Sequence, residues 1–311
     1  MFPGRYNAKN TDFKRKRIFK TAFLCIIILA VLGFSSFFLV KLDFGNGSER
    51  RQLRDFFRSS EYELAYTQSA SMLKEKPLDS YLLAIHGFSA YQLAIAQTNS
   101  FDTLAYVDDC IWSLRKAMLS GENLADGRIY YVLGKAYYYK GPEYMDLAVN
   151  YLEEARSVLF KADDISEYLG LSYAGIRDYR SSVESFSEAL TGEVEPSDLL
   201  LLSIARSYLA LEEADTAKAY LVRCLDISKD FKTTTAARLL LGSTLSKTGD
   251  FSGAETEYLK VIQEDAENAE AHYQLGELYS QEGDITRARA EWRRAIRIDP
   301  AHTLARSRLN V

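Results

Sequence analysis

The chain has 311 residues, of which 47% are apolar, and its formal net charge is −5. This apolar content, five prolines and the lack of a low-complexity run exclude a mainly disordered chain. Seven of the 38 basic and one of the 43 acidic residues lie in the first 20, so the remainder is acidic, with a net charge near −11. That charge argues against nucleic-acid binding, because such affinity depends on neutralising phosphates.

The basic N-terminal segment, residues 1–20, precedes a long apolar run. Residues 21–40 contain no charged side chain, and a helix of that length spans about 30 Å, the thickness of a hydrocarbon core. The alternative is a cleaved signal peptide, whose apolar region is shorter and ends in a small-x-small site. Leu39-Val40-Lys41 offers no such site. We therefore predict an uncleaved transmembrane helix at 21–40.

The charges on either side of this span predict its orientation. Seven basic residues precede it, whereas the acidic and basic residues that follow it nearly balance. The positive-inside rule then keeps the N-terminus in the cytoplasm and sends everything after Lys41 across the membrane. In a bacterium this describes a single-pass protein of the inner membrane with a periplasmic body. A mitochondrial or endoplasmic-reticulum setting stays open.

After Asn46 a pattern of small and large residues recurs about every 34 residues. The pattern is clearest at the C-terminal end, where it comprises Leu275, Gly276, Tyr279, the turn Gly283-Asp284, Ala288, Trp292, Ala295 and Pro300. Each half places its apolar residues on one face of a helix. Small residues stand where two helices must approach closely, and large residues fill the space beside them. This arrangement resembles the tetratricopeptide repeat, a helix-turn-helix unit.

The same pattern divides the chain into about seven repeats. Their ranges are 46–79, 80–126, 127–162, 163–197, 198–234, 235–268 and 269–302. The first two are degenerate: the first begins with a short, charged helix, and about eleven extra residues around Ala94 to Leu104 separate the helices of the second. Residues 303–311 are expected to form a helix that caps the last apolar face.

One repeat cannot bury its own apolar face, so the repeats are expected to stack. The resemblance therefore implies an all-α, right-handed α-solenoid preceded by one transmembrane helix. A chain of 311 residues could hold two or three compact domains, but a solenoid needs no such division.

Residues that would carry catalytic chemistry are sparse. His86, His272 and His302 are far apart, and none has the spacing of a metal ligand. Gly134-Lys135 lacks the upstream glycine of a phosphate-binding loop, and no G-x-S-x-G sequence occurs. Cys110 and Cys224 stand where the repeat requires a small buried residue. We expect no enzyme, no metal site and no cofactor.

The resemblance also implies a binding groove, which the first helix of each repeat lines in tetratricopeptide arrays. The groove positions in this sequence are Tyr81, Phe88, Tyr91, Arg128, Tyr131, Lys135, Tyr138, Tyr139 and Arg206. They do not match the Lys/Asn/Arg carboxylate clamp of some family members, because Tyr131 and Lys135 stand where lysine and asparagine would. A docked protein segment is one interpretation, with Arg128 and Lys135 favouring an acidic one. The other is that the tyrosines fill space between helices.

Arginines gather near the C-terminus, at Arg287, Arg289, Arg293, Arg294 and Arg297. They form either a solvated outer face or a docking patch for an acidic partner or a lipid headgroup.

These features favour a membrane-anchored scaffold or adaptor that binds other proteins within an envelope-associated assembly. Secretion, envelope biogenesis and a periplasmic flagellar apparatus are examples of such assemblies. The alternative is a structural subunit that forms homo-oligomers through the exposed ends of its solenoid. The sequence does not identify the partner, because these arrays serve many unrelated partners.

Overall fold

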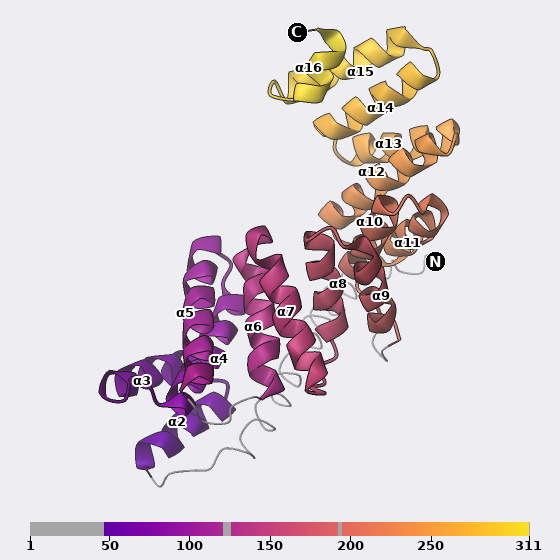
Figure 1. Ribbon diagram of the computed structural model, residues 1–311. Coiled ribbons are helices and arrows are strands. Elements are labelled where there is room, and N and C mark those ends of the chain that lie inside the picture. Colours follow the sequence, from indigo (N-terminus) through magenta and orange to yellow (C-terminus); the bar gives the residue numbers. More distant parts are fainter. Residues whose placement is uncertain (1–46, 121–125, 192–194, 311) are drawn as a thin grey trace, which may run out of the picture. The chain divides into compact units, whose positions relative to one another are not determined.

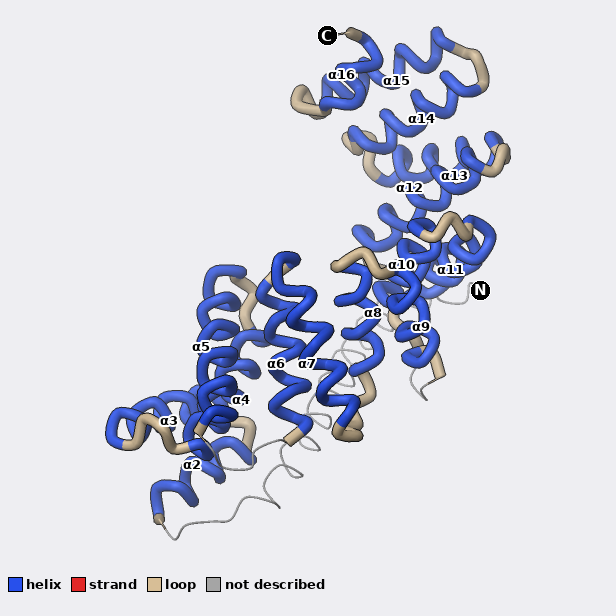
Figure 2. Tube along the Cα trace, in the orientation of Figure 1, coloured by secondary structure: helices blue, strands red, loops and turns tan. Residues whose placement is uncertain are grey.

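The computed structural model describes residues 47–120, 126–191 and 195–310 (Figure 1). Every regular element in these ranges is a helix, and none of them is a strand (Figure 2). The predicted transmembrane helix at 21–40 and the basic segment before it lie outside the described residues. Within the described ranges, no helix combines the length and the apolar character needed to cross a membrane.

The chain divides into two compact units, Met1–Phe160 and Lys161–Val311. The described helices of the first unit are α2 (Ser48–Arg58), α3 (Tyr62–Glu75), α4 (Ser80–Ala96), α5 (Ser100–Leu119), α6 (Gly127–Lys140), the 3-10 turn η1 (Pro142–Tyr144) and α7 (Met145–Ser157). Those of the second are α8 (Ile165–Gly175), α9 (Tyr179–Ala189), α10 (Asp198–Ala210), α11 (Ala214–Ile227), α12 (Phe231–Lys247), α13 (Phe251–Glu264), α14 (Ala269–Gln281), α15 (Ile285–Ile298) and α16 (Thr303–Leu309). Within each unit, consecutive helices pack against one another.

The extra residues of the second predicted repeat do not form an insertion between its helices. They lengthen the helices instead: α4 has 17 residues and α5 has 20, with only residues 97–99 between them. The stretch contains no glycine or proline to stop a helix, and the Asn99 side chain caps α5 by accepting from the backbone N–H of Phe101 at 2.9 Å. The expectation that about eleven extra residues separate the two helices is therefore wrong.

In five of the described helix pairs, the turn between the two helices has one residue in the left-handed region at a fixed place in the repeat. These residues are Ser60, Arg177, Glu212, Gly249 and Gly283, with φ between 60° and 87°. The next residue donates its N–H to a carbonyl five positions earlier, as Asp284 does to Tyr279 at 2.8 Å. This bond satisfies a carbonyl at the end of the first helix. Glycine is therefore the favoured residue at this place, but three of the five turns are made without it.

Five described pairs pack a glycine of the first helix against a large residue of the second, whereas the pair α2–α3 holds Leu53 and Ser69 at these places. A Cβ added at the glycine would come within 2.4–2.7 Å of the large side chain in five described pairs. The pairs are Gly87 with Leu114, Gly134 with Leu152, Gly170 with Phe186, Gly242 with Tyr258 and Gly276 with Trp292. In the pair α10–α11 these places hold Ala205 and Leu221, both fully buried. The two backbones approach closely because the first helix has so little side chain there.

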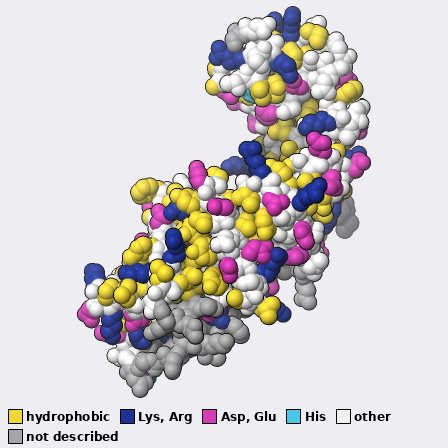
Figure 3. Space-filling model, viewed as in Figure 1, with side chains coloured by type: hydrophobic (Ala, Val, Ile, Leu, Met, Phe, Trp, Pro, Cys, Tyr) yellow, Lys and Arg dark blue, Asp and Glu magenta, His cyan; other side chains and the backbone are white. Residues whose placement is uncertain are grey.

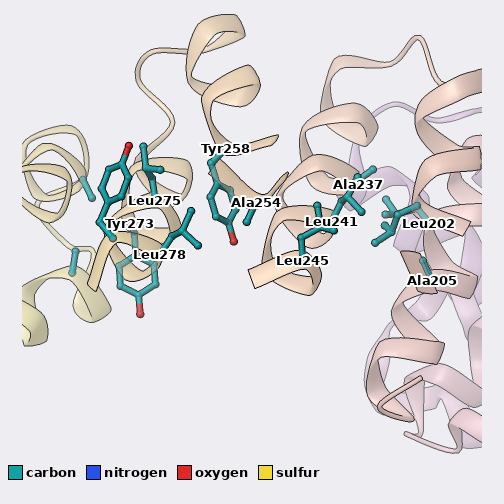
Figure 4. Packing of buried hydrophobic residues seen from close by; sticks show 14 of the residues in the cluster. Leu202, Ala205, Ala237, Leu241, Leu245, Ala254, Tyr258, Tyr273, Leu275 and Leu278 are labelled. Carbon is teal, nitrogen blue, oxygen red and sulfur yellow. The ribbon is translucent and has the colours of Figure 1, made fainter. Parts of the chain in front are cut away.

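The apolar core of the second unit runs from α10 to α16. Leu202, Leu241, Tyr258 and Leu275 belong to one cluster and come from successive helix pairs (Figure 4). The last helix, α16, adds the buried Ala305 and the partly buried Leu309 to this cluster. Each pair thus buries its apolar face against its neighbours, as stacked repeats require.

Candidate protein-binding surface

The predicted groove residues fall in both units. Eight of them lie on α4 and α6 of the first unit, and Arg206 lies on α10 of the second. The Arg206 side chain is exposed. Because these residues belong to separate compact units, we consider the eight residues of the first unit as one cluster and Arg206 by itself.

Most of the cluster is buried. Tyr81, Phe88, Tyr91, Arg128, Tyr131 and Lys135 all lie in the interior of the structure. The expectation of a groove lined by these side chains requires them to be exposed, and these six are not. Tyr138 is half-buried and Tyr139 is 37% exposed, so the solvent-facing edge of the cluster lies at the C-terminal end of α6.

A lysine at the centre of the cluster is surrounded by aromatic rings. The Lys135 ammonium donates to the Tyr131 hydroxyl at 3.0 Å and lies 5.1 Å and 5.8 Å from the ring centroids of Tyr131 and Tyr91. The Tyr131 ring packs on Phe160 at a centroid distance of 5.3 Å. Ring faces attract a cation electrostatically and offset part of the cost of burying it. Because Tyr91 is on α4 and Lys135 on α6, this contact joins neighbouring helix pairs.

A second buried cation lies at the N-terminus of α6. A guanidinium nitrogen of Arg128 is 3.7 Å from a carboxylate oxygen of Asp126, and the same aspartate caps α6 by accepting from the Arg128 backbone N–H at 3.2 Å. Burial lowers the pKa of Arg128, and the charge of Asp126 opposes that shift. The guanidinium stays protonated because its ordinary pKa is so high.

Sequence reasoning missed the basic residues of α2. The Arg50 guanidinium lies 5.5 Å from the ring centroid of Tyr81 and pairs with Asp79. Burial raises the pKa of Tyr81 to about 12, and the charges of Arg54, Arg50 and Arg58 oppose that rise. A signal was available, because Arg54 has the same place in the first repeat as Lys135 in the third. Cations therefore recur at the same repeat position on α2 and α6.

The C-terminal arginines divide into two groups. Arg287 pairs with Asp284 at 2.7 Å and lies 4.1 Å from the ring centroid of Tyr279, and Arg294 pairs with Glu291 at 3.3 Å. Arg289, Arg293 and Arg297 are exposed and form no ion pair among the described residues. Lys and Arg side chains are visible on the surface of the C-terminal helices, at the top of Figure 3. Of the five arginines in the predicted patch, three thus have no ion pair within the described chain.

The histidines serve in separate local contacts. Nδ1 of His86 is 3.0 Å from Ser69 Oγ, and Nδ1 of His272 is 2.6 Å from a Glu291 carboxylate oxygen. Nδ1 of His302 accepts from the backbone N–H of Ala305 and so caps α16. Over the described residues, no group of three or more His, Cys, Asp or Glu side chains is arranged to hold a metal ion.

Two stretches of the chain match family models for the tetratricopeptide repeat, residues 200–231 and 239–303. These stretches are tetratricopeptide repeats. No curated protein matches the sequence. Outside the matched stretches, the pairs α4–α5, α6–α7 and α8–α9 show the same contact between glycine and a large residue.

Solved structures support the same fold. The C-terminal part of a tetratricopeptide repeat protein from Cytophaga hutchinsonii aligns with a TM-score of 0.59 at 16% identity, over 84% of this chain and 99% of that one. YrrB, described as having an unusual peptide-binding site, aligns with a TM-score of 0.52 at 23% identity, over 64% of this chain and 98% of its own. MamA from Desulfovibrio magneticus aligns with a TM-score of 0.50 at 16% identity, over 57% and 97%. At these identities the likeness concerns the fold alone.

Proposed function

We propose that this protein is a membrane-anchored scaffold that binds a protein partner through the aromatic and basic cluster of its first unit. The observation that carries the proposal is the gathering of cations and tyrosines on α2, α4 and α6. Lys135, in contact with Tyr131 and Tyr91, lies at its centre, and Tyr139 forms its accessible edge.

These side chains do not take part in the contact that holds the two helices of one repeat together. The contacts between glycine and a large residue already hold the paired helices together, and they involve other positions. Tyrosine and arginine are frequent anchors of protein interfaces, because each supplies contact area and hydrogen bonds together. A basic cluster on a chain with an acidic body favours an acidic partner segment through charge complementarity. The peptide-binding site ascribed to YrrB agrees with such a use of the fold.

The cluster is accessible to solvent at the C-terminal end of α6, so a partner would make its first contact there. Tyr139 is 37% exposed, and its ring centroid lies 6.4 Å from that of the buried Tyr91. Tyr138 packs edge-on against Tyr139 at a centroid distance of 5.5 Å. A partner segment therefore meets these two rings first and the buried cations only after side chains rearrange.

The test is site-specific photo-crosslinking in the native membrane. A photoreactive residue is placed at Tyr139 and, as a matched control, at Trp112, an exposed aromatic residue on α5 of the same unit. We expect Tyr139 to capture one defined protein that Trp112 does not. Products that join only copies of this chain would favour the alternative, a self-assembling structural subunit. Identical products from both positions would contradict the proposed site.

A paired variant tests the same surface by affinity. Tyr138→Ser with Tyr139→Ser removes both rings at the accessible edge, and Trp112→Ser removes a similar exposed ring elsewhere. Melting temperature and helical signal are compared first, so that loss of folding is excluded. We expect the captured protein to bind the double variant about tenfold more weakly or worse and the control variant as well as the wild type. Unchanged binding by the double variant would overturn the assignment.

We further propose that the role is binding and not catalysis, and that the chain acts in an envelope-associated assembly. The first proposal is supported by the sparse catalytic chemistry of the sequence, and the second by the uncharged residues 21–40 with their basic flank. The identity of the captured protein distinguishes secretion, envelope biogenesis and flagellar assembly.

A further inference from the structure

Three arginines form a stripe along the exposed side of α15. Arg289, Arg293 and Arg297 are four residues apart, so they share one face of the helix, with successive Cα atoms separated by about 6 Å along its axis. All three side chains are exposed. The opposite side of α15 is committed to the core, where Ala288, Trp292 and Ala295 are buried. We call Arg289, Arg293 and Arg297 the arginine stripe.

Other arginines near the stripe form ion pairs with carboxylates of the same unit. Arg287 contacts Asp284 and Tyr279, Arg294 contacts Glu291, and Arg308 donates to Glu277 at 2.8 Å. Among the described residues, no carboxylate pairs with the stripe. Like charges four residues apart on a helix repel one another. Arg297 lies in the last turn, where a cation favours the helix dipole, but Arg289 and Arg293 do not serve the stability of α15.

Packing of the repeat does not require arginine at these places either. The same positions of the preceding helix pair hold Glu255, Leu259 and Gln263 on α13. A stripe of one charge type is thus specific to the last complete repeat. It lies on a chain whose body is acidic, so it is a local site of attraction for a negatively charged molecule.

The chemistry of the stripe favours carboxylates of a protein over a membrane surface. The planar guanidinium presents paired N–H donors that match a carboxylate. Helices that bind the membrane interface insert an apolar face, whereas the apolar face of α15 is buried in the core. We infer that the arginine stripe docks an acidic helical segment of a partner protein, with glutamates at every fourth residue facing the three arginines. This surface lies on the second unit, whereas the aromatic and basic cluster lies on the first, so its test does not depend on that cluster.

The experiment measures binding of a labelled helical peptide with glutamate at every fourth position to the full chain held in lipid nanodiscs. The variant Arg289→Gln, Arg293→Gln, Arg297→Gln removes the stripe. The control Lys218→Gln, Lys232→Gln, Lys247→Gln removes the same charge from exposed positions of α11 and α12. We expect the first variant to bind the peptide about tenfold more weakly, the control to bind like the wild type, and wild-type binding to weaken as salt is raised.

Two results would overturn the inference. The first is equal affinity of the stripe variant and the wild type for the peptide. The second is a stripe-dependent association with vesicles containing phosphatidylglycerol, but not with vesicles of phosphatidylcholine alone, without any stripe-dependent binding of the peptide. The second result would assign the stripe to an anionic membrane surface instead.

Discussion

Single atoms decide how closely the helices of one repeat approach. A Cβ at Gly276 would lie 2.6 Å from two atoms of the Trp292 indole and 3.1 Å from the backbone oxygen of Ala288. The indole is 5% exposed and the backbone is fixed by the helix, so neither can withdraw freely. An alanine at this place must therefore push the two helices apart.

We expect Gly276→Ala to destabilise the second unit by about 1–3 kcal/mol, because it overpacks the contact with Trp292. The sign of this change in stability tests the contact, because replacing glycine by alanine at a helix position without such a neighbour stabilises the helix by about 0.5–1 kcal/mol. Urea denaturation of the full chain followed by far-UV circular dichroism measures the change. A stabilised variant would show that the helices do not meet at Gly276.

The pair α10–α11 supplies a matched control for this prediction. It already combines Ala205 with Leu221 at the equivalent places, both fully buried. The double variant Gly276→Ala with Trp292→Leu copies that combination and should recover part of the loss caused by Gly276→Ala. The recovery appears as a favourable coupling in a double-mutant cycle. Strictly additive losses would contradict the contact.

Backbone conformation at the turns gives a second prediction at this scale. Glu212 has φ 63° at the place where Gly249 and Gly283 stand in the following repeats. A residue with a Cβ costs about 1–2 kcal/mol in this region, part of which glycine regains. We expect Glu212→Gly to raise stability by up to about 1 kcal/mol and Gly283→Ala to lower it by a similar amount. Thermal unfolding of both variants provides the measurement; a loss of stability in Glu212→Gly would show that its turn is not limited by φ.

At the scale of elements, the contact between α3 and α4 contains a buried histidine. The His86 ring stacks on Tyr66 at a centroid distance of 4.3 Å, and its Nδ1 lies 3.0 Å from Ser69 Oγ. Burial lowers the pKa of His86 below its ordinary value of 6.5, although the Tyr66 carbonyl and the charge of Asp109 oppose the shift. The ring is therefore neutral in the folded protein under conditions where the unfolded chain begins to bind a proton.

This shift predicts how stability depends on pH. Below about 6.5 the unfolded state holds more protons at this site than the folded state, so the free energy of unfolding falls as pH falls and is regained above that pH. We expect His86→Gln to reduce the decline in unfolding midpoint of the first unit between neutral and mildly acidic pH. Denaturation of wild type and variant across this range tests the prediction. The same decline in both proteins would assign it to other groups.

At the scale of the whole molecule, the sequence predicts an anchor at 21–40 and a translocated body. The mature chain should then retain residues 21–40 and stay in the membrane through high-salt washing, because an apolar helix of this length inserts almost irreversibly. Protease added to intact spheroplasts should digest the repeats. Protected repeats would contradict the orientation, and a mature N-terminus after Val40 would contradict the anchor.

Local spacing along the chain was enough to predict the helix pairs. Gly276, Trp292 and the turn at Gly283-Asp284 lie within one repeat, so the period of small and large residues shows which faces must meet. The same local information predicted the burial of Cys110 and Cys224, which the structure confirms. The repeat pattern did not predict that Ala94 to Leu104 would lengthen α4 and α5, because the stretch has no counterpart in the other repeats. Its lack of glycine and proline was the signal for continued helix.

What the sequence could not decide depends on residues far apart in the chain. Burial of Lys135 beside Tyr91 requires α4 and α6 to be neighbours, and the pairing of Arg308 with Glu277 joins residues 31 positions apart. Arg287 and Arg294 each follow an acidic residue by three positions, so the sequence itself favours their local ion pairs. The tertiary structure adds the contacts of Arg287 with Glu255 and Tyr279 of other helices. It also shows that no carboxylate of another helix pairs with Arg289, Arg293 or Arg297 in the described chain. An ion pair between two helices, such as that of Arg308 with Glu277, is set by distances of a few ångströms that arise only when the helices pack.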